Sequence, residues 1–260
     1  MSKLIKMDLR RMLNAKLFRV LLIITASLNL VFLIGGMIFI KMVPEIQSSM
    51  TISFADQISV PVQLSLMSIM IYMSVVSFSY ADFAGGYIKN LAGQVGDRGK
   101  LVISKFVVMA IHNFIFLFVC SIANIVAAFI SIFLGSTIEF GADILPALLT
   151  FLLKWLLVTA LGSILIFITN GIRSKTFAVI MGVIFGAGAL NLLYMGVNFG
   201  VMNVLRLKEF NISDYMPDQL VSSVDVATNT LVLNGVIAAV VCIGLFLALT
   251  LKLFKSKDIK

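Results

Sequence analysis

The sequence predicts an all-α integral membrane protein with six transmembrane helices and an amphipathic helix at its N-terminus. Composition is the first reason, because 60% of the 260 residues are hydrophobic, 12% are charged, and the mean hydropathy is +1.09. Soluble domains carry roughly twice that charged fraction. The second reason is the grouping of apolar residues into long stretches, since about 20 of them cross a bilayer as a helix. Helices are expected because backbone groups in lipid must bond within their own segment.

Six apolar stretches are long enough to span a bilayer, and together they make residues 1–260 a single transmembrane domain. Their approximate ranges are 18–40, 60–81, 106–134, 148–169, 177–205 and 230–251. The fourth stretch carries one charge, Lys154, which we expect to reach toward the membrane interface beside Trp155. The polar segments that remain are too short for a soluble domain.

The distribution of basic residues predicts the side of the membrane on which each connecting segment lies. With both termini in the cytoplasm, sixteen of the twenty Lys and Arg residues face that side. The acidic residues that then face outward are Glu45, Asp56, Glu139, Asp143, Glu209, Asp214, Asp218 and Asp225. The strength of this bias predicts a multi-pass protein with cytoplasmic termini.

Residues 1–17 have the pattern of a helix that lies on the membrane surface. At 100° per residue, one side of that helix holds Ile5, Leu9, Met12 and Leu13. Another side holds Lys3, Lys6, Arg10 and Asn14. Such a helix would lie in the headgroup layer with its cations against anionic lipid. The alternative is a basic tail that only sets the topology.

The loop 82–105 is the longest segment predicted to be cytoplasmic between spans, and it is interrupted by five glycines. These are Gly85, Gly86, Gly93, Gly96 and Gly99, which leave one short helical piece at Tyr87–Ala92. A phosphate-binding P-loop is excluded, because Gln94 stands where the motif needs glycine and Leu101 follows Lys100 where it needs Ser or Thr. A turn, a short helix and a second turn could dock into a groove on a partner.

The same loop resembles the corresponding segment in permease subunits of ABC-2-type transporters. An acidic residue ends the second span, Gly-x-x-Lys-Asn-Leu follows, and a basic residue and a lysine lead into the third span. The matching residues are Asp82, Gly86, Lys89, Asn90, Leu91, Arg98 and Lys105, with Tyr87 where Thr is commoner. The resemblance extends to the basic N-terminus, the stretch Tyr215-Met216-Pro217 and the tail Phe254–Ile259. The small exporters of bacitracin and lantibiotic self-protection are closest in style.

The resemblance implies a bacterial plasma-membrane permease that exports a hydrophobic or amphipathic peptide or antibiotic. Its loop 82–105 would couple to a cytoplasmic ABC ATPase, present in two copies, which binds the ATP and Mg. This chain would bind no cofactor itself. A second permease, identical or homologous, would complete the conduit. The implied coupling residues are Asp82, Gly86, Tyr87, Lys89, Asn90, Leu91 and Arg98. The outer segment 206–229 would contain short re-entrant helices before the last span.

Polar residues and glycines inside the spans are the remaining candidates. Residues that could line a transport path are His112, Asn113, Asn124 and Asn191, although hydrogen bonds between helices would also explain them. Two small-residue motifs, Gly182-x-x-x-Gly186 and Gly196-x-x-x-Gly200, favour close helix packing. That packing could lie within one subunit or between two, and the resemblance places the dimer contact on the first and fifth spans.

Several other functions conflict with the composition. A single histidine and two cysteines within apolar runs argue against a metal site or a catalytic site of the chain's own. The net charge of +8 lies in short clusters beside the spans, which argues against nucleic-acid binding. Two alternatives stay open: a stand-alone secondary carrier or channel, and a non-transporting membrane subunit for capture or assembly.

Overall fold

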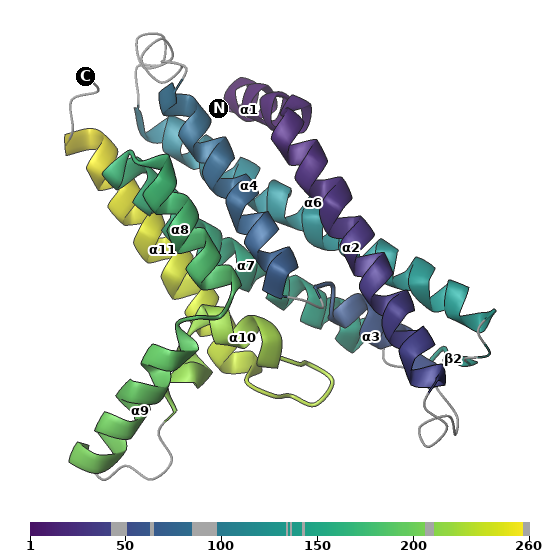
Figure 1. Ribbon diagram of the computed structural model, residues 1–260. Coiled ribbons are helices and arrows are strands. Elements are labelled where there is room, and N and C mark those ends of the chain that lie inside the picture. Colours follow the sequence, from purple (N-terminus) through teal and green to yellow (C-terminus); the bar gives the residue numbers. More distant parts are fainter. Residues whose placement is uncertain are drawn as a thin grey trace.

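The structure is a bundle of long helices, seen in a computed structural model that describes residues 1–42, 51–62, 65–84, 98–133, 135, 137–141, 144–205 and 211–256. Among these residues, the helices long and apolar enough to cross a membrane are α2 (Lys16–Lys41), α6 (Arg98–Ile132), α7 (Ile144–Ile172) and α11 (Val232–Ser256). A fifth crossing is possible if α8 (Lys175–Gly186) and α9 (Asn191–Leu205) count together. Their length and composition agree with the predicted transmembrane character (Figure 1).

The second predicted span corresponds to α4 (Ser65–Ala84), which differs from the other long helices in composition. Its 20 residues include five serines and two tyrosines, and α2, α7 and α8 pack around it. A helix covered by protein on several sides can carry such hydroxyl groups, because neighbouring helices satisfy them. By length and composition α4 is not among the apolar spans of the described chain, so the sixth crossing stays a prediction.

The fifth predicted span, 177–205, is bent instead of straight. Helix α8 ends at Gly186, α9 begins at Asn191, and their axes differ by 65°. Gly188 lies between them with a φ of +68°, in the left-handed region that glycine adopts without strain. As a result α9 points away from the rest of the bundle, as Figure 1 shows at its lower left.

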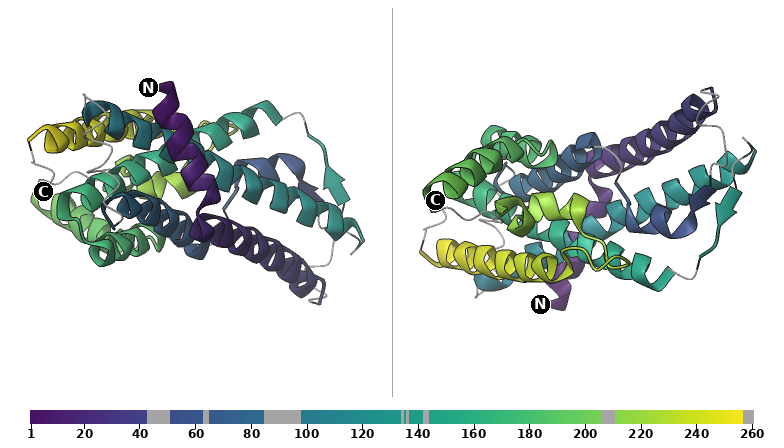
Figure 2. Two further views of the ribbon diagram at one scale, coloured as in Figure 1. Left: turned by 90° about the horizontal axis from the view of Figure 1, so that it is seen from above. Right: turned by 90° about the horizontal axis from the view of Figure 1, so that it is seen from below.

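The two ends of the bundle differ in charge. The helix α1 (Ser2–Asn14) lies across one end, where the C-terminal ends of α4 and α11 and the start of α6 also lie (Figures 1 and 2). We call this the basic end. The opposite, acidic end is built from β1 (Thr51–Ser53), α3 (Phe54–Ser59), β2 (Thr137–Glu139), the 3₁₀ turn η2 (Ile212–Tyr215) and α10 (Pro217–Ser223). The described acids Asp56, Glu139, Asp214 and Asp218 lie at this acidic end, whereas Asp8 and Asp82 lie at the basic end.

The strands β1 and β2 are a departure from the predicted all-α class. They pair in parallel over three residues each, with Ile52 opposite Ile138. Both are short runs that include β-branched residues, which fit a pleated surface well. The pair joins the segment after α2 to the segment after α6, two helices that pack side by side.

The predicted N-terminal helix exists as α1, and its amphipathic pattern is used for packing on protein. Met12 is fully buried in the main core, and Ile5 and Leu9 pack against the same cluster, in contact with α6. Lys3, Lys6, Arg10 and Asn14 are exposed, as expected. The apolar side of the helix is therefore largely covered by the bundle. The basic side is the one available to a headgroup layer or a partner.

Short helices precede the last span, at η2 and α10 within the predicted outer segment. Leu220 of α10 is fully buried against α7 and α11. Pro217 begins this helix at a position where a missing backbone N–H costs nothing. Re-entry of these helices into the membrane stays a prediction.

Candidate functional site

Asp82 is the centre of a buried ion-pair cluster at the basic end. Its side chain is 1% exposed and lies near the C-terminal end of α4. One carboxylate oxygen accepts a hydrogen bond from the Arg11 guanidinium of α1. The other oxygen lies 2.5 Å from the ammonium nitrogen of Lys105, in the second turn of α6. A single carboxylate thus joins three helices.

Three further contacts connect this cluster to its surroundings. The Ser104 hydroxyl donates a 2.7 Å hydrogen bond to Asp8, a buried acid in the middle of α1. The Lys105 ammonium lies 5.7 Å from the ring centre of Phe254 in α11, and Arg11 stacks at 5.4 Å over Phe78. Cations over aromatic faces gain electrostatic attraction where water is excluded. The cluster therefore contacts α1, α4, α6 and α11.

The cluster lies at the two ends of the loop 82–105. Asp82 lies in the last turn of α4 and Lys105 in the second turn of α6, so their ion pair holds together the two helices that flank the glycine-rich stretch. The other implied coupling residues Gly86, Tyr87, Lys89, Asn90 and Leu91 lie outside the described residues. Arg98 is the first residue of α6, and its side chain also lies outside them. The structure thus describes the root of the loop.

His112 and Asn113 form a buried polar group in the middle of α6. The Ser74 hydroxyl of α4 lies 2.8 Å from Nε2 of His112, whose Nδ1 lies 3.1 Å from the Asn113 side-chain oxygen. The Asn113 amide donates to the Val158 carbonyl of α7 at 3.5 Å. Both side chains are at most 1% exposed. These contacts match the alternative interpretation, hydrogen bonding between helices.

Asn124 belongs to a second buried polar group, which forms hydrogen bonds with the C-terminal end of α3. Its amide donates to the carbonyls of Val60, at 2.9 Å, and Gln57, at 3.3 Å. Its side-chain oxygen accepts a 2.5 Å hydrogen bond from Asn29 of α2, which also donates to the Pro61 carbonyl. Non-helical backbone at membrane depth needs such partners. Two asparagines therefore satisfy the carbonyls at which α3 ends.

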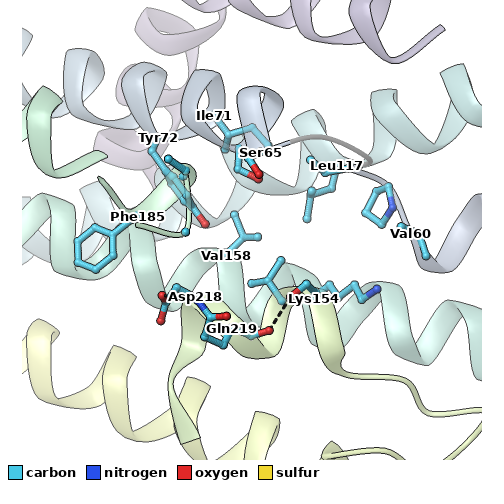
Figure 3. Close-up of a pocket in the computed structure, with 18 of the residues that line it drawn as sticks. Val60, Ser65, Ile71, Tyr72, Leu117, Lys154, Val158, Phe185, Asp218 and Gln219 are labelled. Atoms are coloured by element: carbon cyan, nitrogen blue, oxygen red, sulfur yellow. Dashed lines mark hydrogen bonds between the residues drawn. The ribbon is translucent and has the colours of Figure 1, made fainter. Parts of the chain in front are cut away.

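Asn191, the fourth candidate, borders a cavity of about 440 Å³ at the acidic end (Figure 3). The cavity lies between α4, α7, the bend of α8–α9 and α10, and α6 contributes Leu117. Its polar wall consists of Ser65, Ser68, Tyr72, Lys154, Asn191, Asp218, Gln219 and Ser222. His112, Asn113 and Asn124 are not among its lining residues. Of the predicted path residues, the structure brings only Asn191 to this cavity.

Lys154 is in a different position from the one expected. Snorkelling would place its ammonium at the outer surface of the bundle, whereas the residue is 6% exposed and lines the cavity. Trp155 turns to another side of α7 and donates a 2.8 Å hydrogen bond to the Ala110 carbonyl of α6. Helices α3 and α10 both pack on α7, and the sequence of α7 alone does not reveal that packing.

The two glycine motifs have different surroundings. A Cβ atom on Gly182 would lie 3.4 Å from Tyr72, and one on Gly186 would lie 2.6 Å from the backbone nitrogen of Ile69. The first motif therefore lets α8 approach α4 within one chain. Gly196 and Gly200 have no described atom within 4 Å of such a Cβ, and they lie on α9, which points away from the bundle. Only the second motif is open to a partner.

The part of the chain that the structure describes contains no group of three or more His, Cys, Asp or Glu residues able to hold a metal ion. The residues of the Asp82 cluster that sequence reasoning did not select as site candidates are Asp8, Arg11 and Ser104. A signal was present, because Asp8 is the one acid in an otherwise basic helix and stands three residues before Arg11. An acid in that position indicates an internal ion pair.

No protein-family model matches this sequence, and no curated protein matches it either.

Proposed function

We propose that the chain is the membrane-spanning permease subunit of an ATP-driven ABC exporter. It would move a hydrophobic or amphipathic peptide or antibiotic out of a bacterial cell through the plasma membrane. The basic end would face the cytoplasm, with both termini on that side. Two ABC ATPase subunits would bind there and hydrolyse ATP with Mg, and a second permease, identical or homologous, would complete the conduit.

The observation that carries this proposal is the buried ion pair that joins the two helices flanking the predicted loop 82–105. Asp82 and Lys105 hold the ends of α4 and α6 together, and Arg11 adds α1 to the same carboxylate. A loop with free ends would absorb a push from a partner by bending. A loop whose ends meet in a buried ion pair passes displacement to both helices, because packed elements move as rigid bodies. Such a root suits a segment that couples ATP hydrolysis to the spans.

Co-purification tests the coupling surface directly. We expect the tagged full chain, solubilised from membranes of its native host, to carry a P-loop ATPase with ATP hydrolysis activity. Lys89→Glu together with Leu91→Glu should strongly reduce the amount of bound ATPase. Lys175→Glu is the matched charge reversal, because Lys175 is exposed at the first position of α8. Unchanged association in the double variant, or loss with Lys175→Glu alone, would contradict the coupling assignment.

A stand-alone secondary carrier is the second candidate, and the buried Lys154 favours it. Ionisable groups within membrane-spanning helices often mark ion or substrate pathways. Vesicles that hold the purified chain without an ATPase separate the two functions. We expect no transport driven by a proton or sodium gradient in such vesicles, and robust gradient-driven uptake would favour the carrier instead.

A further inference from the structure

We propose that the cavity at the acidic end binds a small amphipathic zwitterion, whose acid group contacts Lys154 and whose ammonium group contacts Asp218. Both residues line the cavity. In Figure 3 the Lys154 side chain extends away from Asp218, so the two charges face different parts of the same space. The proposal concerns binding, and it rests on the proposed function only in regarding the bound molecule as cargo.

Lys154 supplies the anion-binding half of this site. Its side chain is more than nine-tenths buried and borders the cavity. Among the described residues, no carboxylate lies within 4.0 Å of its ammonium nitrogen. A buried cation gains most from a direct anionic partner, because burial removes part of its hydration. A carboxylate or phosphate that enters the cavity would provide that partner.

The two acids that act on Lys154 electrostatically, Asp225 and Asp56, form no ion pair with it within 4.0 Å. Asp225 acts on Lys154 electrostatically, but its oxygens accept hydrogen bonds from Thr150, at 3.3 Å, and from the backbone of Ala227, at 2.9 Å. Asp56, the other acid that acts on Lys154, lies in the first turn of α3. Asp225 and Asp56 therefore offset part of the positive charge of Lys154 without forming an ion pair with it. The ammonium therefore stays available to a ligand.

Asp218 supplies the cation-binding half. One of its oxygens accepts a 2.9 Å hydrogen bond from the Tyr194 hydroxyl of α9, and the other accepts from the Gln219 amide at 3.2 Å. An ionised carboxylate has about four lone-pair sites, so these two donors leave room for an ammonium. The two bonds also fix the orientation of the carboxylate, which prepares it for a ligand.

The remaining residues of the cavity wall determine what part of a ligand can lie between its two charged groups. Ile71, Leu117, Val158 and Phe185 form an apolar surface, and Ser65, Ser68 and Asn191 add neutral polar groups. Ligand sites commonly have this character, a mostly apolar wall with a few placed polar groups in a space of 300–1,000 Å³. The cavity, at about 440 Å³, suits a small molecule with an apolar body and one charge of each sign. A short apolar peptide with free ends has that chemistry, and so does an ethanolamine phospholipid headgroup.

Equilibrium binding to the purified full chain tests the proposal without any ATPase. The probe is tritiated trileucine, and the chain is held in nanodiscs of phosphatidylglycerol, whose headgroup carries no ammonium. Competition with unlabelled trileucine, trileucine amide and N-acetyl trileucine then separates the two charges. We expect the amide and the acetylated peptide each to compete about tenfold or more weakly, as the loss of a buried charged contact requires. Equal competition by all three peptides would overturn the proposal.

Two variants assign each charge of the ligand to one residue. Lys154→Met should abolish the preference for the free acid over the amide and keep the preference for the free amine. Asp218→Asn should do the reverse. The matched controls are Lys175→Met and Asp214→Asn, since neither residue lines the cavity. If Lys154→Met does not fold, Lys154→Arg keeps the charge and should keep the preference for the acid. A preference that persists in Lys154→Met and Asp218→Asn would overturn the assignment.

A comparison of two lipids distinguishes a free peptide from a phospholipid headgroup as the bound zwitterion. Nanodiscs with phosphatidylethanolamine should weaken trileucine binding if the headgroup occupies the site, and should leave it unchanged if free peptides are the ligands. Either result supports a zwitterion site. Because no ATPase is present, a failure of binding leaves the ATPase co-purification result intact, and a failure of co-purification leaves the binding result intact.

Discussion

Gly186 of α8 lies against the backbone of Ile69 in α4, so closely that a Cβ atom at position 186 would be 2.6 Å from the Ile69 nitrogen. Backbone atoms cannot move aside as the end of a flexible side chain can. The contact brings α8 beside α4 next to the wall of the cavity, which both helices help to line. Gly186 is therefore a position where only glycine preserves the helix spacing.

Replacement of Gly186 by alanine should destabilise the protein by about 1–3 kcal/mol, as overpacking of a close contact does. The matched change Gly196→Ala meets open space, and it should be neutral or slightly stabilising because alanine is the better helix former. The measurement is the fraction of monodisperse protein that survives a temperature series, followed by gel filtration in detergent. Equal heat resistance of the two variants would show that α8 does not approach α4 so closely.

These two glycine motifs show where sequence reasoning reaches its limit. The spacing Gly-x-x-x-Gly correctly indicates that α8 packs closely on another helix, because the spacing is a property of one helix face. It cannot indicate which helix is the partner. Nor did it indicate that Gly188 would bend the segment by 65° and leave Gly196 and Gly200 open. Long apolar helices follow from composition, whereas partners and bends follow from tertiary packing.

The candidate sites show the same division. Asp82 and Asn191 are candidates because of their place in the sequence, at the end of one helix and inside a predicted span, and their roles stay predictions. Lys154 is misplaced by sequence reasoning, because a lone lysine near a helix end is expected at the interface. Its burial depends on tertiary packing, in which α3 and α10 reach α7 from distant parts of the chain. Arg11 completes the Asp82 cluster across 71 positions, a pairing that residue spacing does not encode.

Neutralisation of Asp82 tests the cluster at the root of the loop. Asp82→Asn leaves Lys105, which is 5% exposed, without its carboxylate, and Arg11 loses the same partner. The expected cost is about 3–5 kcal/mol, as is typical when one partner of a buried ion pair is removed. Heat resistance measured by gel filtration checks this cost. Glu139→Gln is the control, because Glu139 is exposed on β2, and it should change heat resistance little.

If Asp82→Asn resembled Glu139→Gln in heat resistance, the ion pair would contribute nothing measurable to the bundle. The role proposed for it in coupling would then lose its structural basis. If Asp82→Asn is destabilised but still binds the ATPase, the cluster would hold the helices together without forming the docking surface. The two readouts therefore separate the anchoring of the loop from the recognition of the partner.

Labelling of single introduced cysteines tests the orientation of the two ends. Ala227→Cys places a thiol in the exposed turn after α10, and Lys175→Cys places one at the exposed first position of α8. A membrane-impermeant maleimide on intact cells should label Ala227→Cys and should reach Lys175→Cys only after the membrane is opened. The unsubstituted chain is the control for Cys120, which is buried, and Cys242, which is partly buried. The opposite pattern would place the basic end outside.

Asn124 provides a test of how α3 is held in the bundle. Asn124→Ala removes donors to the Gln57 and Val60 carbonyls and the acceptor of Asn29, all of which are buried or partly buried. The expected destabilisation is about 1–3 kcal/mol, because the abandoned groups have no water to replace the lost bonds. Asn198→Ala is the matched control, since the Asn198 side chain also forms two hydrogen bonds, one exposed and one partly buried, and it should cost less.

Hydrogen–deuterium exchange distinguishes a local effect of Asn124→Ala from a general one. The end of α3 has only six helical residues before it, and its carbonyls depend on Asn29 and Asn124. We therefore expect faster exchange in Phe54–Ser59 and unchanged exchange in α7, which contacts α3 but shares none of these bonds. Faster exchange throughout the bundle would mean that Asn124 stabilises α6 itself. Unchanged exchange in α3 would mean that the asparagines do not hold its end.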